Sequence, residues 1–82
     1  MNAERSTVRF YICVVDDAGE DLEKGKVYVV LPDATAERDG FLRVVDDSGD
    51  DYLYPVAYFM SVNLPRDVEK MLLSSRTRAL AK

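Results

Sequence analysis

A proline interrupts the longest apolar stretch of this chain, and its position constrains the fold more than any other feature. The stretch runs from Tyr52 to Met60 and carries Pro55 near its middle. Because proline fixes φ and cannot donate a backbone hydrogen bond, the pattern predicts a short aromatic strand, a single 3₁₀ turn at 56–58 and a further short strand at 59–62. A membrane-spanning helix needs about twenty apolar residues in a row, so this stretch is also too short to be one.

Other segments have the residue types and the two-residue period of strands. Together with 59–62, the predicted strands are 8–15, 26–31, 41–46 and 51–54, with a tight turn at 47–50. A helical turn between Ala34 and Gly40 and an open loop are equally good interpretations of that segment. From Pro65 onward the period changes to that of an amphipathic helix at 65–80, and its apolar face is expected to hold Val68, Met71, Leu72, Ser75 and Ala79.

The first predicted strand is apolar on both of its sides. One side carries Val8, Phe10, Ile12 and Val14, and the other carries Arg9, Tyr11, Cys13 and Val15. The interior of a barrel accounts for only one of these sides. We therefore expect the second side to be covered in part by the C-terminal helix or by a neighbouring subunit.

Size and composition indicate one small globular domain, with a barrel at 8–62 and the helix after it. The chain has 82 residues, one cysteine and no histidine, so its core is expected to form without a disulfide or a structural zinc site. The first seven residues are charged and lack an apolar run, so no secretory signal is expected and the cytoplasm is the expected location. The net charge of −4 is unevenly spread, because residues 1–62 carry −7 and residues 63–82 carry +3.

The order of strands and the proline-led turn at 54–59 resemble the Src-homology-3 barrel. Residues 24–33 and 43–55 are similar to a family of short, uncharacterised bacterial proteins with a Src-homology-3-like fold. The resemblance implies a mostly β, five-stranded barrel with a 3₁₀ turn and a C-terminal α-helix, and it implies no activity. The chain lacks the tryptophan and the alanine-leucine-tyrosine-aspartate-tyrosine opening of eukaryotic Src-homology-3 domains, so recognition of proline-rich ligands is not expected.

Aromatic residues supply the candidate partner-binding site. Amphipathic rings are favoured at interfaces and equally at the rim of a small core, and both interpretations stay open. The candidates are Tyr28, Tyr52, Tyr54, Pro55 and Tyr58.

Nothing in the sequence predicts catalysis, a cofactor or a metal ion. Cys13 lies among valines and isoleucine, where an inert buried thiol is expected. Asp46, Ser48, Asp50 and Asp51 have oxygen ligands at suggestive spacing, but the glycine and glutamate of a calcium-binding EF-hand are missing, so a solvated hairpin turn is expected. A ribonuclease site would need histidine, or arginine with glutamate, in a cleft. Arg43, beside the acidic turn, is the only residue that resembles part of such a site.

The leading hypothesis is a non-catalytic protein-interaction module that binds through a tyrosine-rich, acid-rimmed surface and the C-terminal helix. Its partner is not identified by the sequence, and a homodimer is one option. The alternative hypothesis is a small nucleic-acid-associated regulator that uses the basic helix residues Arg66, Lys70, Arg76 and Arg78. Nucleic acid is the less favoured partner, because the acidic body would repel phosphate and no aromatic ring lies among these cations.

Overall fold

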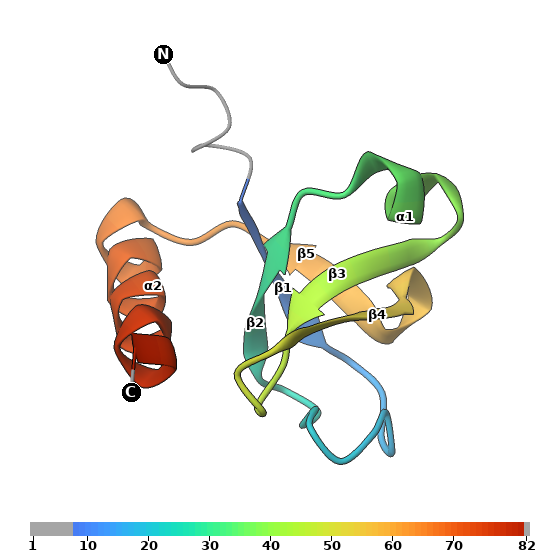
Figure 1. The fold of residues 1–82 in the computed structure, drawn as a ribbon, viewed down its shortest axis with the longest axis horizontal. Helices are drawn as coiled ribbons and strands as arrows, with labels where there is room; N and C mark the ends of the chain where they lie inside the picture. The colour runs from blue at the N-terminus through green and yellow to red at the C-terminus, as the bar shows by residue number, and fades with distance from the viewer. Residues whose placement is uncertain (1–7, 82) are drawn as a thin grey trace.

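Five antiparallel strands form one strongly curved sheet, with a 3₁₀ turn and two helices, in a computed structural model that describes residues 8–81 (Figure 1). Within the last helix, only the backbone is described for 75–81. The elements in chain order are β1 (Arg9–Cys13), β2 (Val27–Leu31), α1 (Ala34–Arg38), β3 (Phe41–Val45), β4 (Asp51–Pro55), the 3₁₀ turn η2 (Val56–Tyr58), β5 (Phe59–Val62) and α2 (Arg66–Ala81). This confirms the mostly β architecture with a 3₁₀ turn and a C-terminal helix.

The sheet is open. Its strand order is β4-β3-β2-β1-β5, so β4 and β5 are edge strands and are not paired with each other. The five predicted strands are all present, but hydrogen bonding between the described residues does not close them into a barrel. The chain passes from β4 to β5 through η2, where the Val14 N–H donates to the Tyr58 carbonyl at 2.9 Å.

Local signals explain the turns that connect these strands. Asp33 caps α1 by accepting from the Ala36 N–H at 3.0 Å, and Gly40 ends the helical turn with φ of +89°, which glycine adopts without strain. The predicted hairpin between β3 and β4 is confirmed. The Asp46 N–H donates to the Asp50 carbonyl at 3.0 Å across the turn, and Gly49 holds its left-handed position with φ of +92°.

Apolar side chains cover both faces of the sheet. The inner core, on the concave face, consists of Cys13, Leu22, Tyr28, Val30, Leu42, Val44 and Phe59. A smaller outer core on the opposite face consists of Phe10, Val29 and Val45, with Val8, Val27, Leu31, Val62, Leu64 and Leu72 packed against it. The sheet is therefore apolar on both of its faces, as the two apolar sides of the first strand indicated.

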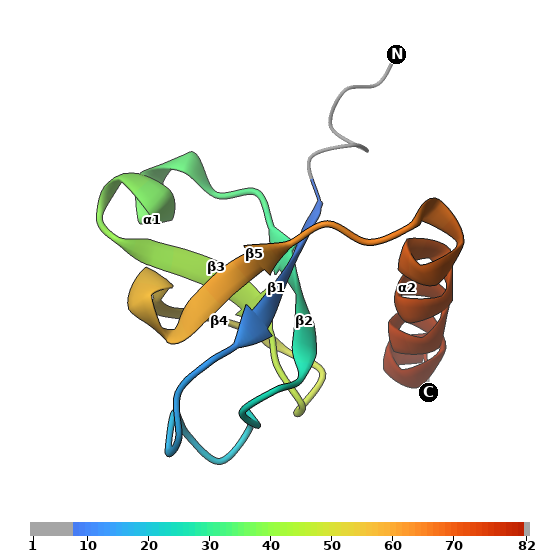
Figure 2. The same ribbon diagram turned by 180° about the vertical axis from the view of Figure 1, so that it is seen from behind.

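Helix α2 contacts the outer core through Leu72. It stands beside β1 and β2 after a short extended linker, as both views show (Figure 1, Figure 2). Leu72 is its half-buried contact with the outer core, whereas Met71, which the predicted apolar face included, is 64% exposed. Ser75 and Ala79 of that face lie outside the described side chains. Across 8–81, no helix has the length and apolarity that crossing a membrane requires.

The two sides of β1 have roles opposite to those expected. Tyr11, Cys13 and Val15 face the inner core, whereas Phe10, on the other side, belongs to the outer core beneath α2. Alternation alone cannot tell which of two apolar sides is inside, because the choice depends on the direction in which the sheet curves. Cys13 is 1% exposed, which confirms the expected buried thiol.

Candidate functional site at strand β4

The acidic hairpin turn before β4 contains a buried carboxylate. Asp46 is only 1% exposed, so the expectation of a fully solvated turn is wrong at this residue. Its Oδ1 accepts from the Ser48 N–H at 3.0 Å and from the Ser48 hydroxyl, and its Oδ2 accepts from the Tyr54 hydroxyl at 2.6 Å. Burial alone would raise the pKa of Asp46, but these bonds together hold the pKa below its ordinary value. The carboxylate therefore organises the turn and anchors the Tyr54 ring.

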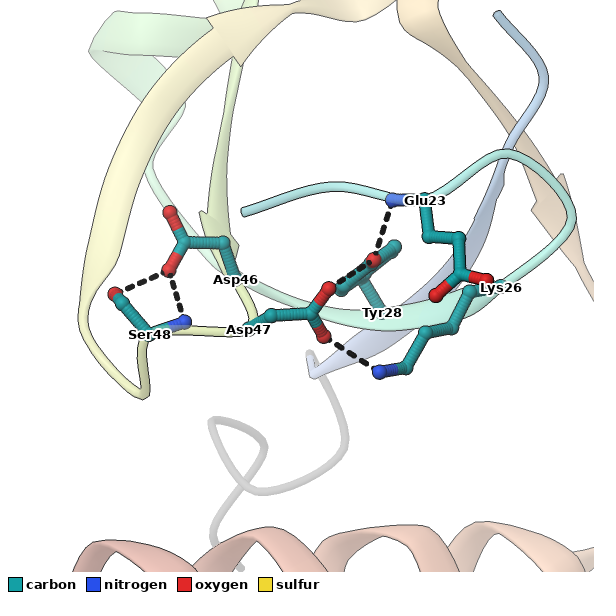
Figure 3. A network of polar contacts seen from close by, with 6 residues as sticks. All are labelled: Glu23, Lys26, Tyr28, Asp46, Asp47 and Ser48. Carbon is teal, nitrogen blue, oxygen red and sulfur yellow. Dashed lines mark hydrogen bonds and ion pairs between the residues drawn. The ribbon is translucent and has the colours of Figure 1, made fainter. Parts of the chain in front are cut away.

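A second polar network joins this turn to the acidic loop that precedes β2 (Figure 3). The Tyr28 hydroxyl accepts from the Glu23 N–H at 2.8 Å and donates to Asp47 Oδ2 at 2.9 Å. Lys26 Nζ donates to Asp47 Oδ1 at 2.6 Å, and the Asp47 N–H donates to the Asp21 carbonyl at 2.9 Å. Burial, followed by the bond to Asp47, raises the pKa of Tyr28, so its hydroxyl stays protonated and continues to donate. The two acidic segments are thus held side by side at one end of the sheet.

Arg43 connects α1 with β4 on the outer face. Its Nη2 and Nε lie 2.8 Å from Asp33 Oδ2, and its Nη1 lies 3.0 Å from Asp51 Oδ2. The bond to Asp33, and then the bond to Asp51, raise the pKa of Arg43, while the Ala36 N–H and then Arg43 lower the pKa of Asp33. Arg43, which the sequence placed beside the acidic turn, is paired with two aspartates. These are contacts that tether elements to each other.

The tyrosines of the predicted patch do not form one surface. Tyr28 is fully buried, so its assignment to an outer binding patch is corrected: both its ring and its hydroxyl are used inside the protein. Tyr54 and Tyr58 are half-buried and pack their rings against Phe59, with centroids 6.3 and 6.4 Å away. Both therefore lie at the rim of the inner core. Tyr52, which is 52% exposed, and the half-buried Pro55 remain accessible on β4.

A different group of apolar side chains is exposed around Tyr52. Phe41 is 39%, Leu53 is 46% and Val56 is 44% exposed, and all lie on β4 or immediately beside it. Phe41 is the cross-strand partner of Pro55, and Leu53 is that of Arg43, which places Phe41 and Leu53 on the outer face. We call Phe41, Tyr52, Leu53 and Val56 the β4 surface.

Sequence reasoning missed three members of the β4 surface because their types are those of ordinary core residues. The signal that could have found them is the edge position of β4, which depends on strand order. The remaining exposed large apolar side chains of the described part are Met60 on β5 and Met71 and Leu73 on α2.

The cations proposed as nucleic-acid contacts lie on α2, away from β4. Arg66 and Lys70 are exposed in its first turns, and Asp67 and Glu69 lie between them. The side chains of Arg76 and Arg78 lie outside the described part of the helix. Among the side chains that the structure describes, no group of three or more cysteine, aspartate or glutamate residues is arranged to hold a metal ion.

Comparison with known proteins identifies no relative of this chain. No protein-family model, no curated protein sequence and no solved structure matches the chain.

Proposed function

We propose that this chain is a non-catalytic protein-interaction module and that the β4 surface is its contact site. The observation that carries the proposal is the gathering of four exposed large apolar side chains, Phe41, Tyr52, Leu53 and Val56, at one sheet edge. Single exposed apolar residues are common on protein surfaces. Here Phe41 and Leu53 lie on the outer face and Tyr52 lies on the opposite face, so exposed apolar side chains flank the edge of β4 from both sides, which favours a site that another strand or protein covers. Aromatic and aliphatic anchors of this kind supply most of the binding energy at interfaces.

The acidic groups near the β4 surface gather at one end of β4, so they favour a partner whose own acidic groups lie away from that end. Asp50 and Asp51 lie at the start of β4, and the acidic turn joins the loop before β2 at the same end of the sheet. Such a rim steers encounter and orientation more than it adds affinity. The nearby carboxylates of Asp46 and Asp47 are committed to internal hydrogen bonds, which supports a structural role for the acidic turn.

In this proposal the fold is a variant of the Src-homology-3-like barrel found in a family of short bacterial proteins. Two features support the assignment: the antiparallel strand order β4-β3-β2-β1-β5, and the 3₁₀ turn η2 that follows Pro55 between β4 and β5. The proline-rich ligands of eukaryotic relatives are not part of the proposal, because no tryptophan is present to form their groove.

Site-specific photo-crosslinking in living cells tests the contact site. A photoreactive phenylalanine analogue replaces Tyr52 in one variant and Thr35, an exposed residue of α1, in the control. We expect a protein adduct from position 52 and none from position 35. Equal adducts from both positions, or no protein adduct from position 52, would contradict the proposed site.

The alternative, a nucleic-acid-associated regulator, is separated by a salt titration. Binding of RNA and DNA is measured for the wild type and for a variant with Arg66→Gln and Lys70→Gln, at increasing salt concentration. A steep loss of affinity with salt that weakens in the variant would favour nucleic acid as the partner, because each phosphate contact releases counterions. Weak binding without a salt slope is the result that our proposal expects.

A further inference from the structure

The backbone of β4 has a free edge whose hydrogen-bonding groups can be identified from the register. The Asp46 N–H donates to the Asp50 carbonyl, and the Val56 N–H donates to the Gly40 carbonyl at 2.9 Å. Both pairs continue the β3–β4 register, in which Val44 lies opposite Tyr52 and Leu42 lies opposite Tyr54. Because hydrogen-bonded and non-hydrogen-bonded pairs alternate along an antiparallel ladder, the backbone groups of Tyr52 and Tyr54 point toward β3.

It follows that Asp51, Leu53 and Pro55 direct their backbone groups away from β3. No strand of the described sheet lies on that side of β4. Asp51 and Leu53 each present an N–H and a carbonyl there, whereas Pro55 presents a carbonyl only.

Little protects this edge from pairing with another strand. Natural edge strands are blunted by lysine, by proline, by bulges or by covering elements. Here proline stands only at the last position of β4, and the side chain of Asp51 is already paired with Arg43 at 3.0 Å. Between them, Tyr52 and Leu53 are about half exposed. The edge is therefore apolar at its centre, and no described strand is paired with it.

We propose that two copies of this chain pair through β4, antiparallel, with Leu53 of one copy opposite Leu53 of the other. The proposal rests on the proposed function and names the partner of the β4 surface. In this register the two Leu53 residues exchange both of their backbone hydrogen bonds, and each Asp51 N–H donates to the Pro55 carbonyl of the second copy. The Pro55 carbonyl accepts a hydrogen bond in this register. Because proline has no N–H, the return bond from Pro55 to the Asp51 carbonyl is missing in each half of the dimer.

The side chains are self-complementary in that register. Leu53 packs against Leu53 of the second copy on the outer face, and Tyr52 lies opposite Tyr54 of the second copy on the other face. Aromatic pairs at non-hydrogen-bonded positions are close neighbours and are favourable cross-strand pairs. A two-fold arrangement of this kind buries the same surface on both copies and closes on itself.

Charge disfavours the neighbouring register that is shifted toward the acidic turn. With Leu53 opposite Leu53, the two Asp51 residues are four residues apart along the joint, about 14 Å, which exceeds the screening length of about 8 Å at physiological salt. A shift that brings Tyr52 opposite Tyr52 reduces this separation to about 7 Å. Parallel pairing would bring the acidic turns of both copies to the same end of the joint.

Disulfide trapping tests the register directly. Cysteines at a hydrogen-bonded antiparallel pair have Cα atoms about 5.5 Å apart, which a disulfide spans. We expect Leu53→Cys to form a covalent dimer through residue 53 under mild oxidation. The wild type, whose Cys13 is 1% exposed, and Arg38→Cys, on the exposed part of α1, are expected to remain uncrosslinked. Crosslinking from position 38 to the same extent as from position 53 would overturn the register.

Proline scanning separates the two edges of the sheet. The N–H of Leu53 faces the free edge of β4, so Leu53→Pro removes an intermolecular bond without removing a β3–β4 bond, and Leu53→Thr keeps the N–H. Ser61 occupies the equivalent outward position of β5, because Val14 donates to Tyr58 and the β1–β5 register then alternates. Sedimentation of each variant over a range of concentrations measures the dissociation constant of the dimer.

We expect Leu53→Pro to raise that constant about tenfold or more, and Ser61→Pro to leave it within about threefold. Leu53→Thr loses the packing between the two leucines but keeps the N–H, so we expect it to raise the constant less than Leu53→Pro does. Loss of the dimer in both proline variants would indicate that β4 pairs with β5 of the next copy, and it would overturn the symmetric pairing. A dimer that persists in Leu53→Pro would also overturn it. A wild type that stays monomeric at the highest concentration would overturn dimerisation, while a foreign protein adduct from position 52 would leave the proposed function standing. If Leu53→Pro does not fold, as judged by circular dichroism, Leu53→Lys replaces it with the same expected result.

Discussion

The bond between Tyr54 and Asp46 offers the sharpest test of how the acidic turn is held. Tyr54→Phe removes only the hydroxyl, and the ring that remains at position 54 keeps its edge-on contact with Phe59, whose centroid lies 6.3 Å away. Any loss of stability in this variant therefore reports on the hydrogen bond and not on packing.

The expected loss is about 2 kcal/mol in the free energy of unfolding. The bond is 2.6 Å long and its acceptor is a carboxylate that is 1% exposed. Hydrogen bonds to charged groups contribute about 1.5–3 kcal/mol. Asp46 keeps both bonds from Ser48 on its other oxygen, so the carboxylate is not left entirely without partners and the middle of that range applies. For a domain of this size the loss corresponds to a melting temperature lower by about 10 °C.

The pH dependence provides an independent check of sign. The pKa of Asp46 is lowered in the folded protein, so its contribution is fully present above the ordinary aspartate pKa of about 3.9 and is lost as pH falls through the lower folded value. The stability difference between wild type and Tyr54→Phe should shrink over that acidic window. The pKa of the neighbouring Asp21 is raised, by partial burial and then by Asp46, Glu20 and Asp47. Its contribution to stability therefore changes with pH in the opposite direction to that of Asp46. Because Asp21 is present in both proteins, it does not account for a difference between them.

Urea unfolding at about pH 7 and at several values below about pH 4 measures the difference. Tyr52→Phe is the matched control, because Tyr52 lies on the same strand and is 52% exposed, and its loss should stay within about 0.5 kcal/mol. Equal losses in the two variants at neutral pH would refute the reasoning. A Tyr54→Phe deficit that persists unchanged in acid would refute the assignment to an ionised Asp46.

Three further perturbations address the other contacts. Tyr28 and Tyr54 have raised pKa values, so a spectrophotometric titration above the ordinary tyrosine pKa of about 10 should not detect their ionisation until the protein unfolds. The free energy of unfolding should fall as pH rises above that value. Leu72→Ala should lower the free energy of unfolding by about 1 kcal/mol, and the exposed Met71→Ala by much less, in urea titrations. Arg43→Met removes the tether to both aspartates and should accelerate amide exchange in α1 and β4 without changing exchange in β5.

Local chemistry was sufficient to place most elements. Pro55 predicted the 3₁₀ turn at 56–58 and the strand after it, and both are observed with the same bounds. Gly49 predicted the tight turn between β3 and β4, since a short polar turn with glycine permits the left-handed backbone that such a loop needs. Between Ala34 and Gly40 the signals were balanced, and the capping bond from Asp33 accounts for the helical turn that forms.

The location of Asp46 shows where a correct pattern was not carried far enough. Leu42 and Val44 face the inner core, and the same alternation places residue 46 on that face. The acidic character of the turn suggested a solvated carboxylate instead. The donors that make burial tolerable include the Tyr54 hydroxyl, which comes from the next strand and reaches Asp46 only after the hairpin has formed.

By itself, the sequence determined the kinds and order of the elements, because proline, glycine and alternation act on the backbone within a few residues. Only the tertiary structure decided which side of β1 is inside, which tyrosines are covered and which strand is left at the edge of the sheet. Tyr28 and Tyr52 are alike as residues in aromatic strands, yet one is fully buried and the other half exposed. The reason is physical: the burial of a side chain depends on strand order and sheet curvature, which bring together segments that are distant in the chain.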